Sequence, residues 1–133
     1  MFAEISETFA ALQYQHQQVM LRFGEFSRLL YITDQRVATA ESLMRVITEI
    51  SMHFGFEESL MEAGAYAEFD HHRRQHLGIM TELGLMIDRL ESDKGLSELA
   101  RGADFLLHWY QQHIANSDCA FEAWLRLYVA EAP

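Results

Sequence analysis

The chain has 133 residues and a mass of 15.4 kDa, a size at which one domain buries a hydrophobic core. Twenty Asp and Glu residues against ten Lys and Arg residues give a net charge of −10, which argues against nucleic acid and anionic membrane surfaces as partners. A single cysteine excludes an internal disulfide, and no segment resembles a signal peptide or a membrane span. These features predict one cytoplasmic domain over residues 1–133, without membrane insertion.

Four segments repeat apolar residues at alternating spacings of three and four, the pattern of helices that bury one face in a bundle. In chain order they cover about residues 8–31, 37–63, 68–91 and from 96 onward. The only proline is the last residue, so nothing inside the chain interrupts a long helix. The pattern therefore predicts an all-α protein.

The breaks between the segments contain typical helix-ending residues. Thr33 or Asp34 is expected to cap the second helix, and Gly64 is expected to end it in a left-handed conformation. Residues 92–95 separate the third and fourth helices. Short connections make neighbouring helices antiparallel, which predicts an up-down-up-down four-helix bundle. Residues from about 117 onward are expected to form a short C-terminal helical extension.

Most of the histidines fall on the apolar faces of these helices. The start of the first and third helices and the end of the second and fourth lie at the same end of an antiparallel bundle. The polar residues expected in one layer there are His16, His53, Glu57, His72, His76 and His113. Asp118 is rotated off the stripe of His113 but lies close enough to reach the layer, whereas His71 and His108 fall outside the stripes and are expected to be exposed.

A single histidine on an apolar face is usually a hydrogen-bonded core residue, but six converging polar groups are a different case. Each unpaired buried polar group costs about 1–3 kcal/mol, and a buried carboxylate costs more. Together they would cancel the ~5–15 kcal/mol that stabilises a small domain. A bound metal is therefore favoured over a metal-free polar network.

Five imidazoles and two carboxylates are too many donors for one ion and suit two. If both carboxylates and one hydroxide or oxide bridge two octahedral ions, a single coordination position stays open for a small ligand. Imidazole and carboxylate donors suit iron, and manganese, cobalt or zinc stay possible on ligand type alone.

The motifs that carry these donors resemble the hemerythrin family, and specifically its single-domain bacterial members. They are Gln15-His16, His53-Phe54-x-x-Glu57-Glu58, Tyr66 six residues before His72-x-x-x-His76, and Trp109-x-x-x-His113-Ile114-x-x-x-Asp118. The resemblance runs from about residue 12 to 121. It implies two iron ions (Fe2+/Fe3+) with a bridging oxo or hydroxo group, and O2 as their ligand.

Carried over residue by residue, the resemblance assigns His72, His76 and His113 to one iron. It assigns His16 and His53 to the iron with the open position, with Glu57 and Asp118 bridging the two.

The resemblance also implies an O2 pocket lined by Phe54, Trp109, Tyr110 and Ile114. Tyr110 departs from the family pattern, in which leucine is common at this position. We expect either that its ring packs in the core and its hydroxyl bonds to the backbone or solvent, or that the hydroxyl donates a hydrogen bond to the bound ligand.

The function implied is reversible O2 binding for storage, transport or delivery, by a protein that is not an enzyme. Two alternatives stay open: a sensor of O2, NO or redox state, and a di-iron enzyme that handles peroxide or NO. The ligand is a small molecule in each case, with NO or anions possible besides O2.

Overall fold

The computed structural model describes residues 2–32, 35–92 and 96–131. Its helices are α1 (Phe2–Ile32), α2 (Arg36–Ala63), α3 (Phe69–Glu91), α4 (Leu96–His113) and α5 (Cys119–Glu131). A π-helical turn, η1 (Ile114–Asp118), joins α4 to α5. The predicted segments thus match α1 to α4 closely, and the predicted C-terminal extension is α5.

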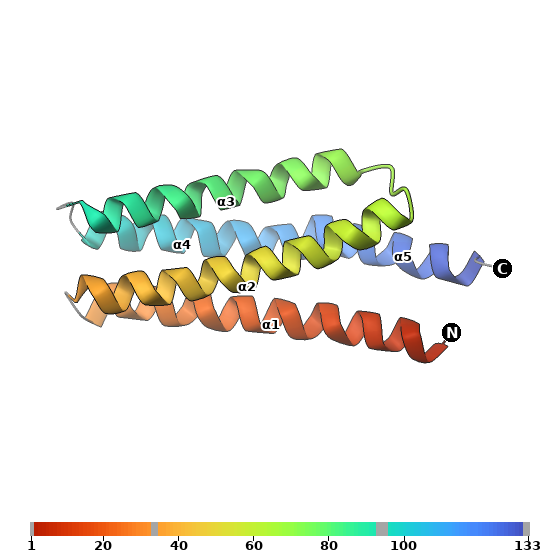
Figure 1. Ribbon diagram of the computed structural model, residues 1–133, viewed down its shortest axis with the longest axis horizontal. Coiled ribbons are helices and arrows are strands. Elements are labelled where there is room, and N and C mark those ends of the chain that lie inside the picture. The colour runs from red at the N-terminus through yellow and green to blue at the C-terminus, as the bar shows by residue number, and fades with distance from the viewer. Residues whose placement is uncertain (1, 33–34, 93–95, 132–133) are drawn as a thin grey trace.

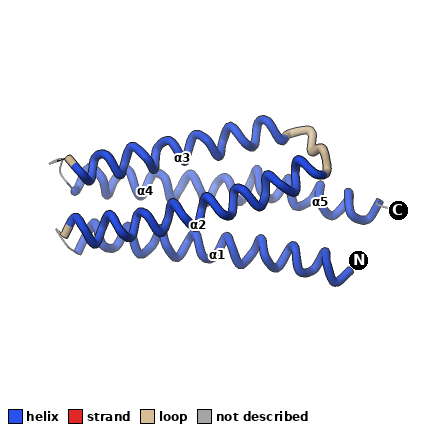
Figure 2. Tube along the Cα trace, in the orientation of Figure 1, coloured by secondary structure: helices blue, strands red, loops and turns tan. Residues whose placement is uncertain are grey.

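The four long helices lie side by side, each antiparallel to the next (Figures 1 and 2). α1 contacts α2 and α4, and α3 also contacts α2 and α4, so the helices form a closed ring in up-down-up-down order. Both ends of the chain and the loop between α2 and α3 lie at the same end of the bundle (Figure 1). The predicted all-α four-helix bundle is therefore confirmed.

The apolar stripes meet in two separate clusters inside the bundle. The main core cluster fills most of its length and includes Val19, Phe23 and Phe54 as well as the buried apolar residues of α3 and α4. A smaller end cluster consists of Leu12, Met61, Phe121 and Leu125, with partly buried neighbours such as Trp124. Each fully buried apolar side chain contributes about 1.5–3 kcal/mol. The layer where the histidines were expected separates the two clusters.

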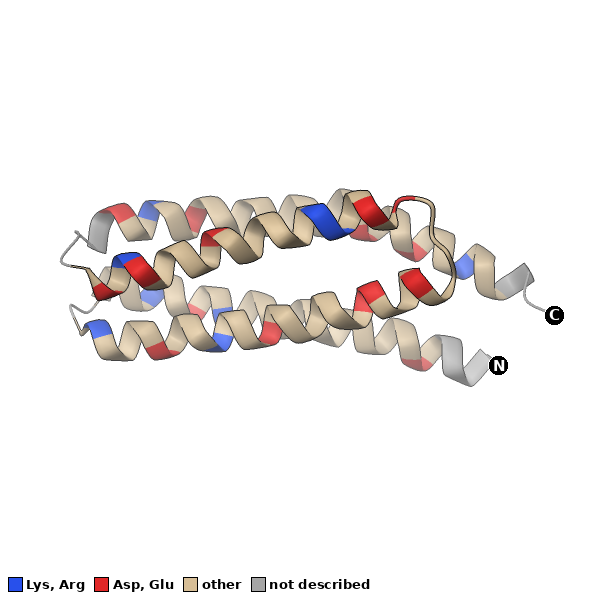
Figure 3. Cartoon of the chain, turned by 45° about the horizontal axis from the view of Figure 1, so that its top comes forward, with Lys and Arg blue, Asp and Glu red and all other residues tan. Residues whose placement is uncertain are grey.

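Charged residues are spread over the described helices, and acidic residues outnumber basic ones along the chain (Figure 3). Arg36 links the start of α2 to the end of α3, because its Nη1 donates to the carbonyl oxygens of Leu90 (3.1 Å) and Ser92 (3.0 Å). None of the described helices combines the length and apolar character that crossing a membrane requires.

The end of α2 differs from the prediction. Gly64 has φ −93° and ψ 0°, an ordinary right-handed conformation, and the left-handed residue is Ala65, with φ 54°. The prediction of a left-handed Gly64 is therefore wrong. A side chain at Gly64 would overlap the indole ring of Trp124, so the glycine is explained by the close approach of α5. The cap predicted at Thr33 or Asp34 falls outside the described residues.

Gly64→Ala is expected to lower the free energy of unfolding by about 1–3 kcal/mol, because the added methyl group overlaps Trp124 while the backbone angles suit alanine. Gly78→Ala is the matched control: a Cβ there meets nothing within 4 Å, so better helix propensity should raise stability by up to about 1 kcal/mol. Urea unfolding of both variants measures the difference. Equal effects of the two substitutions would contradict the explanation.

Candidate metal centre

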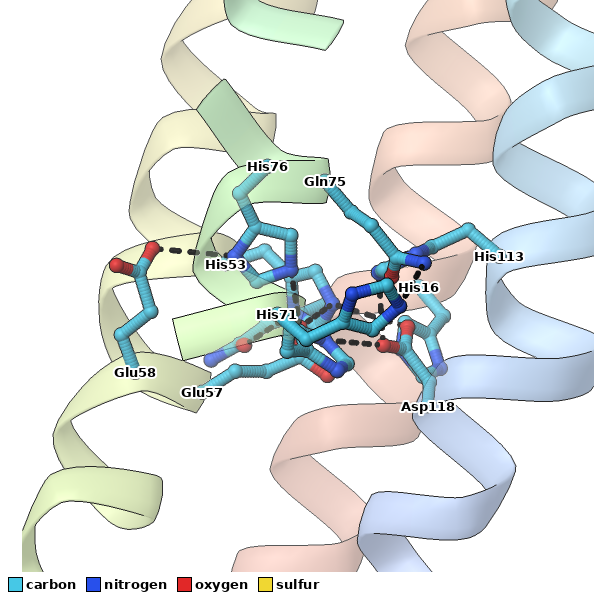
Figure 4. A network of polar contacts seen from close by, with 11 residues as sticks. His16, His53, Glu57, Glu58, His71, Gln75, His76, His113 and Asp118 are labelled. Atoms are coloured by element: carbon cyan, nitrogen blue, oxygen red, sulfur yellow. Dashed lines mark hydrogen bonds and ion pairs between the residues drawn. The ribbon is translucent and has the colours of Figure 1, made fainter. Parts of the chain in front are cut away.

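Five segments of the chain bring seven polar side chains into one layer (Figure 4). α2 and α3 each supply two residues four positions apart, which places both on the same face of their helix. α1, α4 and η1 supply one residue each. The seven are His16, His53, Glu57, His72, His76, His113 and Asp118, all between 0% and 6% exposed. His71 and His108 are exposed, as the sequence predicted.

The π-helical turn explains how Asp118 joins the layer. In an α-helix, residues five apart differ by about 140° around the axis, so Asp118 would point away from the face of His113. A π-helix forms i to i+5 hydrogen bonds and fits more residues into each turn, so the two side chains share a face. His113 Nε2 lies 3.0 Å from Asp118 Oδ1. The sequence predicted that Asp118 lies within reach of the layer, but it did not predict this turn.

A signal for the turn was present in the sequence. The α4 stripe continues regularly from Leu106 through Tyr110 to His113, and an unbroken α-helix would next bury residues 117, 120 and 124. The residues actually buried are Asp118, Phe121 and Leu125, each one position later. The slip of one residue in the apolar pattern marks the inserted residue of η1.

The two carboxylates lie between the imidazoles. Asp118 is 3.1 Å from His16 Nε2 and 3.0 Å from His72 Nε2. Glu57 Oε1 is 3.5 Å from His53 Nε2, 3.6 Å from His72 Nε2 and 3.3 Å from His76 Nε2. Each carboxylate therefore contacts histidines of more than one helix.

These donor atoms form two groups within which all ligand atoms lie within 4.8 Å of one another. Both groups contain Glu57 and Asp118. One group adds His72, His76 and His113, and the other adds His16 and His53. A set of donors that divides in this way suits two ions that share both carboxylates.

Most of the donor atoms lack a hydrogen-bond partner inside the protein, and this suits them to hold a metal. The buried atoms without a hydrogen-bond partner include Nε2 of His53, His72, His76 and His113, both Oε atoms of Glu57, and Oδ1 of Asp118. Several of these atoms lie 3.0–3.6 Å from one another without forming a hydrogen bond. Unpaired buried polar atoms cost about 1–3 kcal/mol each, and coordination of a cation removes this cost.

Two of the imidazoles are oriented by a partner on their other nitrogen. His53 Nδ1 donates to Gln15 Oε1 at 2.8 Å, and His76 Nδ1 donates to Glu58 Oε2 at 3.1 Å. A proton held on Nδ1 leaves the lone pair of Nε2 directed into the layer, as metal ligation requires. Gln15 was not predicted to do this, since the sequence shows only that it precedes His16.

Aromatic rings cover the layer on the side of the main core cluster. Phe54 stacks on His76 with ring centroids 3.6 Å apart, and Trp109 stacks on His113 at 5.0 Å. Tyr110 is fully buried, and Ile114 is partly buried against the main core cluster. The four residues predicted to line an O2 pocket thus lie around the layer, and that role stays a prediction.

Burial and mutual charge shift the pKa values of the donors in opposite directions. Burial raises the pKa of Glu57 to about 8. Burial alone would also raise the pKa of Asp118, but His113, His16 and other neighbouring histidines hold it far below its usual value. Burial opposes protonation of His72, yet Asp118 and Glu57 raise its pKa to about 9. Burial, with His72 and His113 nearby, lowers the pKa of His76 to about 2. The shifts of both Glu57 and His72 favour the protonated form in the metal-free layer at pH 7.

Metal uptake at pH 7 is expected to release protons, because Glu57 and His72 must lose theirs to coordinate. Calorimetric titration with metal in two buffers of different ionisation enthalpy measures the number released. The raised pKa values also mean that the folded metal-free protein binds more protons than the unfolded chain. Its free energy of unfolding should thus fall as pH rises from 7 to 9. Uptake without proton release would contradict the protonation state.

Gln15→Ala is expected to weaken metal binding about 10- to 100-fold, because His53 loses the acceptor that orients its ring. Gln13→Ala, an exposed position on the same helix, is the control and should leave the affinity unchanged. Competition with a chelator under argon measures both affinities with Fe2+. Equal affinities of the two variants would show that Gln15 does not orient the ligand.

Comparison with known proteins agrees with this arrangement. The model of the hemerythrin HHE cation-binding domain family matches residues 8–125. A bacteriohemerythrin of Stenotrophomonas maltophilia (strain R551-3) is 30% identical over 87 residues, which amount to 65% of this chain and 56% of that protein. The match thus spans little more than half the length of that relative. No solved structure matches the chain. With its helical bundle and its buried histidine and carboxylate cluster, the chain belongs to the hemerythrin HHE domain family.

Proposed function

We propose that this chain is a non-heme di-iron protein that binds O2 reversibly and serves its storage, transport or delivery. One observation carries the proposal: seven buried donor residues form two groups that share two carboxylates, and most of their donor atoms lack a hydrogen-bond partner. Family membership makes iron the first choice among the metals that suit these donors.

In this proposal the two groups hold one iron each. His72, His76 and His113 would hold one, His16 and His53 would hold the other, and both would share Glu57 and Asp118. Two iron ions held by these groups would supply reversible O2 binding. Gln15 and Glu58 keep the Nε2 atoms of His53 and His76 available by accepting from their Nδ1 atoms.

On the side of the main core cluster, the surroundings of the layer favour binding over turnover. Among the described residues, the buried polar side chains other than the seven donors are Thr39, Ser42 and Tyr110. Thr39 and Ser42 lie near the start of α2, at the opposite end of the bundle (Figure 1). The main core cluster excludes water from its side of the layer, and it offers no carboxylate or histidine for general acid–base catalysis.

Metal analysis and spectroscopy of the purified protein test the proposal. About two irons per chain are expected, with a visible spectrum of the reduced protein that changes in air and reverts under argon. His72→Ala should lose iron, whereas His71→Ala, its exposed neighbour, should keep both ions. One zinc per chain would refute the di-iron centre, and rapid irreversible oxidation in air would favour sensing or turnover instead.

A further inference from the structure

Tyr110 carries a buried polar group that the seven donors leave unexplained. It lies on α4, one turn before His113, and its side chain is 0% exposed. Its ring packs against Phe23 (centroids 5.9 Å apart) and Phe54 (6.4 Å), both of which belong to the main core cluster. Phe54 in turn stacks on His76. The phenol therefore lies on the apolar side of the metal layer, away from α5.

The hydroxyl of Tyr110 has no hydrogen-bond partner among the described residues. An unsatisfied buried hydroxyl costs about 1–3 kcal/mol, and phenylalanine would fill the same space without that cost. The hydroxyl shares this condition with the donor atoms of the layer, which also lack partners in the metal-free fold. A group that completes the metal centre is therefore the natural candidate for its acceptor.

The electrostatics of the hydroxyl show what it can do. Burial raises the pKa of Tyr110 far above its ordinary value of 10, and the negative charges of Asp118 and Glu57 raise it further. The hydroxyl therefore keeps its proton at any physiological pH. It acts as a hydrogen-bond donor beside the metal layer.

We propose that Tyr110 Oη donates a hydrogen bond to the small ligand at the open coordination position and makes the pocket selective for ligands whose acceptor atom carries negative charge. A hydrogen bond to a charged acceptor is stronger than one to a neutral acceptor. Small anions and O2, which gains charge from reduced metal, fall in this class, and carbon monoxide does not. This inference rests on the proposed function, because it requires the metal pair.

Azide is a suitable probe, since it is a small anion with an acceptor atom at its free end. Tyr110→Phe is expected to raise the Kd of azide for the oxidised, iron-loaded protein about tenfold or more. The control is Tyr14→Phe on the exposed face of α1, which should leave the Kd unchanged. The infrared band of bound azide should also shift more in D2O for the wild type than for Tyr110→Phe, because only the wild type carries the exchangeable phenol proton.

Unfolding of the metal-free protein separates this role from ordinary packing. Because the hydroxyl has no protein partner, metal-free Tyr110→Phe should be as stable as the wild type or more stable. A clear loss of stability would show that the hydroxyl is bonded within the protein, which overturns the inference.

The outcomes also separate this inference from the proposed function. A wild-type protein that holds no iron overturns the proposed function and this role with it. A wild-type protein with two irons whose azide Kd equals that of Tyr110→Phe leaves the proposed function standing and overturns the role of Tyr110 alone.

Discussion

The cost of burying charge is the constraint on which the rest of this structure depends. Two carboxylates and five imidazoles lie within a layer that is closed to solvent, and Asp118 alone has Nε2 atoms of three histidines at 3.0–3.1 Å. In the metal-free chain, protons on Glu57 and His72 partly balance this charge. Coordinated cations balance it better, because they satisfy the lone pairs that protons and hydrogen bonds leave open. Bound metal is therefore expected to stabilise the folded domain.

The apolar clusters on either side give the layer its rigidity. The main core cluster extends toward the end of the bundle where α1 ends and α2 begins. The end cluster closes the other side of the layer and consists of Leu12, Met61, Phe121 and Leu125. A stacked ring packs against the face of an imidazole while a polar partner holds its edge, as with Phe54 and Glu58 around His76. The donors are therefore held in place before any ion arrives, which reduces the ordering that binding must impose.

Much of the fold and of the donor set could be predicted from the sequence, because apolar periodicity reports which face of a helix is buried. The same periodicity placed six of the donors on core faces, and antiparallel order placed them at one end. Three features needed the structure. Gly64 is explained by contact with Trp124, far away in sequence, and not by local backbone geometry. Gln15 on α1 accepts a hydrogen bond from His53 on α2, and apolar periodicity does not predict such partners. The turn η1 changes the spacing between buried residues, so the pattern after it no longer fits 3.6 residues per turn.

The turn η1 also determines everything that follows it. α5 continues directly from η1, so the inserted residue sets the rotation of the whole C-terminal helix as well as the direction of Asp118 (Figure 1). Phe121 and Leu125 face the end cluster only because the register has shifted by one position. If the same residues continued as an unbroken α-helix, the Asp118 carboxylate and the apolar face of α5 would both rotate away from the bundle. The extra residue of this turn thus fixes the direction of the Asp118 carboxylate and the buried face of α5 at the same time.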